Sequence, residues 1–226
     1  MLLFFAGASI IDITTERESP RSDFNRPLFM KGINFSANIA QWNTTVLPYI
    51  RQLTFRIAST VDVYWFDAMI RSRALPGLMN NVTKLDLTGF HWFSGISPNR
   101  SVNPYLASAS QLSSLREVSF TLHAASITTS LWSERQAIEL EITDPVRSQA
   151  RRVLTLRTVL VKYGLDAFFN CTKLEHISLM YINSDIVTAN IQFKDPEKLI
   201  EAIEKWLASG FKKRQQQVLV TSSQAT

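Results

Sequence analysis

The sequence predicts a single α/β domain in which short parallel strands line one face and helices cover the other. Three observations predict it: four apolar segments recur with one spacing, helix signals lie between them, and the composition is that of a folded protein. With 46% hydrophobic and 19% charged residues, the 226-residue chain can bury a sizeable core. We expect one domain over residues 1–226, with an irregular segment at 1–28 and a frayed tail at 222–226.

The recurring segments share the pattern apolar-x-x-apolar-x-apolar. They begin at Ile50, Val82, Leu115 and Leu174. The last two apolar positions of each segment lie two residues apart, so both point to the same side of an extended strand. This is the strand pattern of a leucine-rich repeat, and it predicts an open solenoid. Weaker copies are expected at 33–35 and 218–220.

The spacing of these strands is wider than in regular repeats. Their apolar centres are Leu53, Leu85, Val118 and Ile177, which follow one another after 32, 33 and 59 residues. Regular leucine-rich repeats recur after about 20–29 residues. A generic α/β domain with apolar strands in a parallel sheet is therefore the alternative. Four gapless copies, each preceded by a helix-like segment, favour the solenoid.

Helix signals occupy the intervals between the strands. Asp195 and Pro196 begin a helix with an apolar face, and Gly210 is expected to end it. A second helix is expected to run from Asp144–Pro145 to Gly164. A third covers residues 63–75 and ends at Pro76–Gly77.

These segments resemble the divergent leucine-rich-repeat-like proteins of filamentous fungi, many of which are F-box-like. The resemblance extends from about residue 30 onward and rests on the strands IRQLTFRI, VTKLDLTGF, LREVSFTL and CTKLEHISLMYI, the helix LIEAIEKWLASGF and the segment QQVLV. It implies a substrate receptor of a cullin-type ubiquitin ligase where an F-box docks on the Skp adaptor. Residues 1–46 show no F-box pattern, and Leu47–Pro48 is expected to lead directly into a strand. The resemblance therefore covers the repeat part without the adaptor-binding part.

The concave strand face of such a solenoid is the expected binding surface. Aligning the four copies places mostly small or polar side chains on it in three columns. The columns are Gln52, Lys84, Glu117 and His176; Thr54, Asp86, Ser119 and Ser178; and Arg56, Thr88, Thr121 and Met180. A protein or peptide suits this surface better than a small apolar ligand, which needs a deep pocket. Ordinary solvation of a half-exposed sheet explains the same polarity.

Catalytic and cofactor motifs are absent from the sequence. It has no phosphate-binding loop, dinucleotide fingerprint, nucleophile elbow or His-Glu-x-x-His metal motif. His91, His123 and His176 are far apart along the chain, and Cys171 lies between apolar residues. We therefore expect a non-enzymatic interaction module without cofactor or metal. A hydrolase built on an α/β sheet is the remote alternative.

The charge pattern favours a protein partner over nucleic acid. The net charge is +5, and five basic residues lie between Val146 and Tyr163 without an acidic one. Two of them, Arg147 and Arg151, are expected on one helical face. A solvated helix surface explains this cluster, since no aromatic stacking platform or reading-helix motif accompanies it. The sequence has no run of about 18 apolar residues, so it predicts no membrane span. The single cysteine favours a reducing intracellular compartment, the cytoplasm or the nucleus.

Two aromatic runs, 64–66 and 90–93, cannot lie wholly on one buried face. Some of their rings must therefore lie in loops or at an interface. Core packing is the simpler explanation for these runs. The alternative is that some of the rings form a hot spot for a partner.

Overall fold

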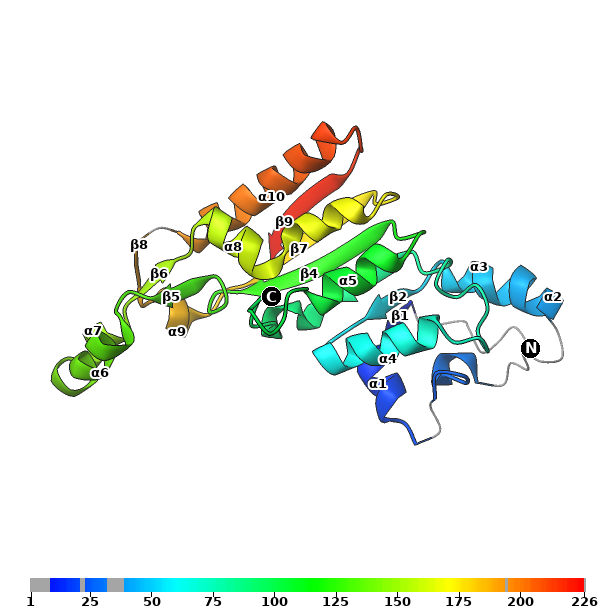
Figure 1. Cartoon of the computed structure of the whole chain (residues 1–226), viewed down its shortest axis with the longest axis horizontal. Coiled ribbons are helices and arrows are strands. Elements are labelled where there is room, and N and C mark those ends of the chain that lie inside the picture. The colour runs from blue at the N-terminus through cyan, green and yellow to red at the C-terminus, as the bar shows by residue number, and fades with distance from the viewer. Residues whose placement is uncertain (1–8, 21–22, 32–38, 194, 226) are drawn as a thin grey trace.

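The computed structural model describes residues 9–20, 23–31, 39–193 and 195–225. They form a six-stranded sheet covered by helices, with a smaller three-stranded sheet beside it (Figure 1). The strands of the large sheet are β1 (Ile10–Asp12), β2 (Thr54–Arg56), β3 (Lys84–Leu87), β4 (Glu117–His123), β7 (His176–Ile182) and β9 (Leu219–Gln224). Those of the small sheet are β5 (Thr128–Ser130), β6 (Arg151–Val153) and β8 (Ile191–Phe193).

The strands of the large sheet follow the order of the chain. The order is β1-β2-β3-β4-β7-β9, and every neighbouring pair is parallel. The four predicted strands are therefore sequential parallel neighbours, as the repeat pattern requires. The weak copy at 218–220 falls on β9, whereas the one at 33–35 lies outside the described residues.

Burial alternates along these strands, so the sheet has one covered face and one open face. In β7, for example, Ile177, Leu179 and Tyr181 are buried, whereas His176 and the other alternate residues are half-exposed. One row of buried side chains joins all six strands in register. Its members are Ile11, Phe55, Leu85, Val118, Ile177 and Val220. This row is the centre of the hydrophobic core.

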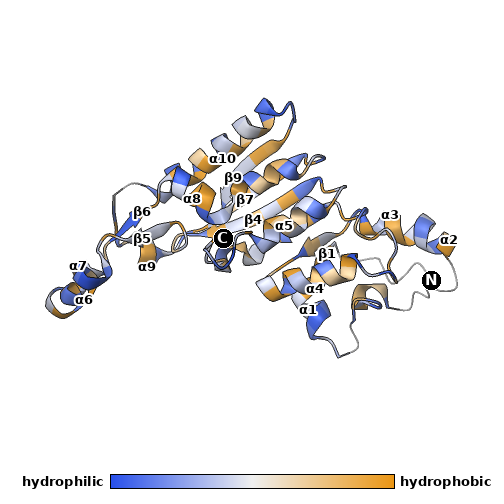
Figure 2. Cartoon of the chain, in the orientation of Figure 1, coloured by the Kyte–Doolittle hydropathy of each residue, from blue (hydrophilic) through white to orange (hydrophobic). Residues whose placement is uncertain are grey.

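Helices fill the intervals between the strands and supply the other half of the core. They are α1 (Ile13–Glu18), η1 (Leu28–Met30), α2 (Ile39–Gln41), the π-helical η2 (Trp42–Val46), α3 (Leu47–Ile50), α4 (Thr60–Ile70), η3 (Thr88–Trp92), α5 (Pro104–Gln111), α6 (Glu134–Thr143), α7 (Pro145–Ser148), α8 (Leu156–Tyr163), η4 (Leu165–Asn170), α9 (Asp185–Thr188) and α10 (Pro196–Lys213). Figure 1 shows α4 and α5 in front of the sheet, and Figure 2 shows hydrophobic residues concentrated where helices meet strands. No helix in the described part of the chain combines the length and apolar composition that a bilayer span requires.

The last helix begins as predicted but ends later. The carboxylate of Asp195 accepts a hydrogen bond from the backbone N–H of Glu197, and Pro196 occupies the first helical position. The helix then continues through Gly210 to Lys213, so the predicted end at Gly210 is wrong. A Cβ atom at Gly210 would lie 2.2 Å from Cζ of Phe169. Glycine therefore makes room for that ring and does not end the helix.

Aromatic rings link η3, which follows β3, to strand β4 and helix α8. The ring of Phe90 packs against Phe120 and Tyr163, with centroids 5.2 and 5.6 Å apart. The aromatic run 90–93 is partly buried and partly exposed, as expected. Phe90 and Phe93 are buried, whereas Trp92 is 75% exposed. The run at 64–66 divides in the same way.

The long interval between Val118 and Ile177 holds β5, β6 and four helices instead of one long helix. The predicted helix from 144 to 164 is wrong, because residues 151–153 pair with β5 and β8 as strand β6. Its two ends are confirmed: Asp144 and Pro145 begin the short helix α7, and Gly164, with a φ of 61°, ends α8. The helices α6 and α7 form a projection, the arm (residues 134–148), beyond the small sheet (Figure 1).

Both ends of the chain contain more regular structure than expected. Residues 1–28, predicted to be irregular, include β1 and α1. The predicted frayed tail is wrong for residues 222–224, which pair with β7 as part of β9. The sequence pattern missed both because each segment is short and is ordered by pairing with a distant strand.

A buried carboxylate attaches α1 to α4. Asp62 accepts hydrogen bonds from Ser59, from Thr14 and from Nε of Arg17, the last at 2.9 Å. Burial alone would raise the pKa of Asp62, but these hydrogen bonds and the Arg17 charge outweigh it and hold the pKa below 3.8. The first strand and its helix are therefore tied to the rest of the domain by a paired charge.

Two further helix boundaries differ from the prediction. The third predicted helix, 63–75, is α4, which begins after the N-cap Ser59 and ends at Ile70. Leu47 and Pro48 do not lead directly into a strand, because they belong to α3 and three turn residues separate it from β2. Proline fits there because the first turn of a helix needs no N–H donor from it.

A close backbone approach joins β2 to β3 at Gly89. The N–H of Gly89 donates to the carbonyl of Ile57 at 2.9 Å, and the carbonyl of Gly89 accepts from the Tyr105 hydroxyl. A Cβ atom at this position would lie 2.2 Å from the carbonyl oxygen of Ala58. The neighbouring backbone therefore leaves no space for a side chain.

We predict that Gly89→Ala lowers the free energy of unfolding by about 3 kcal/mol, because the backbone after β2 must shift. Gly77→Ala is the matched control, since its φ is +79° but its nearest contact is an acceptable 3.5 Å. We expect it to cost about 1 kcal/mol of backbone strain alone. Urea denaturation measures both. Equal losses in the two variants would contradict the close approach.

Candidate functional site

The open face of the large sheet brings most of the predicted site residues together. It consists of Thr54, Arg56, Lys84, Asp86, Glu117, Ser119, His176, Ser178, Met180 and Thr221, all half-exposed. Adjacent strands set these side chains side by side, because parallel pairing in register aligns them in rows. One row runs through Thr54, Lys84, Glu117 and His176. The next runs through Arg56, Asp86, Ser119, Ser178 and Thr221.

All three predicted columns are wrong at β2 by two residues. Gln52 was aligned with Lys84, but the strand partner of Lys84 is Thr54, and that of Asp86 is Arg56. Gln52 lies in the turn before β2. The shift arose because Leu53, Phe55 and Ile57 alternate over five positions and match the pattern in either register. Because the shift is even, Thr54 and Arg56 remain on the predicted face.

Two other predicted members do not belong to the open face. Thr88 follows the end of β3 and begins η3, where its hydroxyl faces the carbonyl of Ile57. Thr121 lies on β4 beside η3 and is only 7% exposed. The strands differ in length, and the third column of the alignment extends past the end of β3. Met180, in contrast, remains half-exposed on β7.

The charges of the open face are paired across neighbouring strands. Nε of Arg56 lies 2.9 Å from Oδ2 of Asp86, whose other oxygen accepts from the Ser119 hydroxyl at 2.7 Å. Nζ of Lys84 lies 2.9 Å from Oε1 of Glu117. In each pair the cation is on the earlier strand and the acid on the next. The face is therefore rich in donors and acceptors but carries no excess of either sign in these pairs.

The same arrangement continues at the edge of the face. Arg116 and Glu175, which precede β4 and β7, form a third pair with 2.6 Å between nitrogen and oxygen. Both side chains are more than half exposed. Exposed pairs of this kind contribute little to stability, about 0–1 kcal/mol.

The sequence alignment missed Thr221. Its hydroxyl lies 3.0 Å from Nε2 of His176, so it extends the polar row onto β9. The weak copy at 218–220 carries the signal that could have found it. Continuing the alternation of Val220 by one position places Thr221 on the open face.

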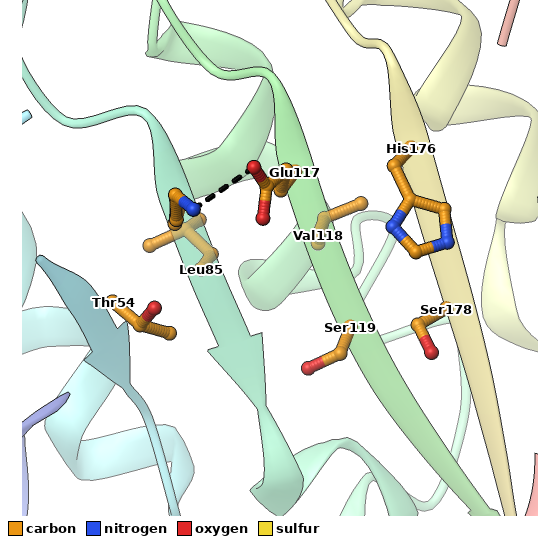
Figure 3. A pocket seen from close by; sticks show the side chains of 8 residues that line it. Thr54, Leu85, Glu117, Val118, Ser119, His176 and Ser178 are labelled. Atoms are coloured by element: carbon orange, nitrogen blue, oxygen red, sulfur yellow. Dashed lines mark ion pairs between the residues drawn. The ribbon is translucent and has the colours of Figure 1, made fainter. Parts of the chain in front are cut away.

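A shallow depression of about 200 Å³ lies at the middle of the open face. Its lining residues are Thr54, Lys84, Leu85, Glu117, Val118, Ser119, His176 and Ser178. Figure 3 shows Glu117, His176, Ser119 and Ser178 around it, with the Lys84–Glu117 ion pair along one side. A depression of this size is smaller than typical small-molecule sites of about 300–1,000 Å³.

The thiol lies away from this face, whereas His123 lies at its far end, on the last residue of β4 and in register with Ile182. Cys171 is buried, and burial raises the pKa of its thiol to about 11, so it is protonated at neutral pH. His123 lies near His91, and burial together with that neighbour lowers the pKa of His123. Among the described residues, no group of three or more His, Cys, Asp or Glu side chains is arranged to hold a metal ion.

The basic cluster between Val146 and Tyr163 does not form a helical stripe. Arg147 lies in the arm and stacks on Trp132, whereas Arg151 lies in β6 and donates to Thr128. Lys162 donates to the carbonyl of Ser126. The predicted single helical face for Arg147 and Arg151 is therefore wrong, because a strand interrupts the helix between them.

Comparisons of this chain with protein-family models, curated proteins and solved structures find no match. The feature to be explained is an open sheet face with ordered, paired polar side chains.

We predict that Asp86→Ala lowers the free energy of unfolding by about 1–3 kcal/mol, because Arg56 and Ser119 both lose their acceptor. Glu175→Ala, which breaks the exposed pair with Arg116, is the control, and we expect a loss of at most about 1 kcal/mol. Urea denaturation of both variants provides the comparison. The proposed network is contradicted if Asp86→Ala costs no more than Glu175→Ala.

Proposed function

We propose that the chain is a non-enzymatic interaction module that binds a protein or peptide on the open face of its large sheet. We further propose that the sheet is an open, leucine-rich-repeat-like solenoid. Its sequential strand order and its division into a covered and an open face support this assignment.

The observation that carries the proposal is the ordered polarity of the open face. Its side chains are held in rows by strand pairing and by the Arg56–Asp86 and Lys84–Glu117 ion pairs. Donors and acceptors whose positions are already restrained lose little entropy when a partner binds. A broad surface with a shallow depression suits a protein or peptide better than a small molecule.

The pairing of charges argues against nucleic acid as the partner. Binding to phosphates draws on unneutralised lysines and arginines. On the open face Arg56 and Lys84 each have an acidic neighbour at 2.9 Å. A phosphate backbone would have to displace those acids before it gained the same cations.

The hydrolase alternative finds little support in the contacts of this face. Thr221 touches His176, which is half of a nucleophile–base arrangement. The acid beside His176 in the row, Glu117, pairs with Lys84. Ser119 donates to Asp86, and the charge of that carboxylate is paired with Arg56.

A role as the substrate receptor of a ubiquitin ligase would use the same face. It rests on the resemblance to F-box-type proteins, and Skp binding separates it from the general proposal. If Skp and a cullin co-purify with this chain, the chain is a ligase receptor and not an adaptor-free module.

We predict that Ser178→Arg abolishes partner capture from a lysate of the source organism, because the long side chain covers the central depression. Ser209→Arg makes the same chemical change on the exposed side of α10 and is the matched control. Quantitative mass spectrometry of proteins retained by wild type and both variants provides the measurement. Retention of the same proteins by Ser178→Arg would contradict the assignment of the open face.

A further inference from the structure

The arm exposes apolar side chains that the rest of the described chain does not cover. Ile138, Ile142 and Val146 are 56, 83 and 80% exposed. Neither α6 nor α7 has a buried residue. A helix of ten residues is marginal in water by itself, since most helices depend on packing of an apolar face. The arm therefore has the properties of a surface that another surface covers.

The charges of the arm indicate what kind of surface fits it. Glu134 and Glu141 are exposed, and in the described residues neither forms an ion pair, whereas Glu139 pairs with Arg135. The arm thus combines exposed apolar side chains with acids that have no ion-pair partner among the described residues. Figure 2 shows both hydrophobic and hydrophilic residues in α6 and α7. The complementary surface must be basic and partly apolar.

Such a surface exists on this chain, on β6 and α8. Arg152 and Arg157 are exposed, and neither has an acidic partner among the residues that the structure describes. Val161, one turn after Arg157 on α8, is 67% exposed. The patch of Arg152, Arg157 and Val161 therefore carries the charges and the apolar group that the arm lacks.

The two surfaces flank the same strand. The arm ends at Ser148, β6 covers Arg151–Val153, and α8 begins at Leu156. Because β6 alone separates the arm from α8 along the chain, a twofold axis beside β6 would bring the arm of each copy to α8 of the other. Because each arm contacts the other copy, the assembly closes at two copies. Its interface then contains both arms and both patches. The arm alone is small against the roughly 1,600 Å² that a standard interface buries.

We propose that the chain forms a symmetric homodimer in which the arm of one copy packs on β6 and α8 of its partner. Ile138 and Ile142 contact the partner across its α8, and Glu134 and Glu141 face the basic patch. This contact lies outside the open face and does not depend on the function proposed for it.

Charge exchange tests the reciprocal contact most sharply. The arm variant carries Glu134→Lys and Glu141→Lys, and the α8 variant carries Arg152→Glu and Arg157→Glu. Each variant alone places like charges at both contacts, so each is expected to sediment as a monomer where wild type is a dimer. An equimolar mixture restores opposite charges at both contacts and is expected to form a one-to-one heterodimer. Sedimentation velocity provides the measurement.

Controls separate this contact from other assemblies and from misfolding. Lys213→Glu, on the exposed end of α10, is expected to leave the dimer unchanged. Ile142→Asp is expected to give a folded monomer with a wild-type circular dichroism spectrum, because this side chain is 83% exposed. A wild-type monomer at all concentrations would overturn the proposal. So would an α8 variant that still dimerises, which indicates arm-to-arm pairing, or a mixture that stays monomeric.

Discussion

The parallel pairing of six strands in chain order is the constraint on which the rest of the structure depends. It aligns Phe55, Leu85 and Val118 in one buried row, which continues to β1 and β9. The same pairing sets the polar positions side by side on the opposite face. Core and candidate site are thus two consequences of one register, because side chains of a strand alternate between faces.

The ion pairs of the open face follow from that register. Arg56 reaches Asp86, and Lys84 reaches Glu117, because adjacent strands place their side chains within contact distance. Such pairs order the surface more than they stabilise it, since partly exposed pairs contribute little. This explains how a face can be polar and ordered while its charges are paired.

The sequence predicted the parts of the fold that repeat. Alternation of apolar residues identified the strands at Leu85, Val118 and Ile177 and the face of nine of the twelve candidate residues. It misplaced Gln52 because a five-residue alternation fits two registers. Alternation missed β6. This strand is ordered by pairing with β5 and β8, which follow β4 and β7 along the chain. Short strands without internal periodicity leave no local signal, so only their tertiary partners reveal them.

The register of the open face is tested by cross-linking cysteines placed at Ser119 and Ser178, which are strand partners on this face. Each single cysteine should react with a thiol reagent in the native protein, whereas Cys171 stays protonated and buried. The pair should cross-link within one molecule, whereas cysteines at Thr54 and Ser178 should not, because three strand spacings, about 14 Å, and two residues along the strand separate them. Unreactive single cysteines, or cross-linking of the distant pair alone, would contradict the open face and its register.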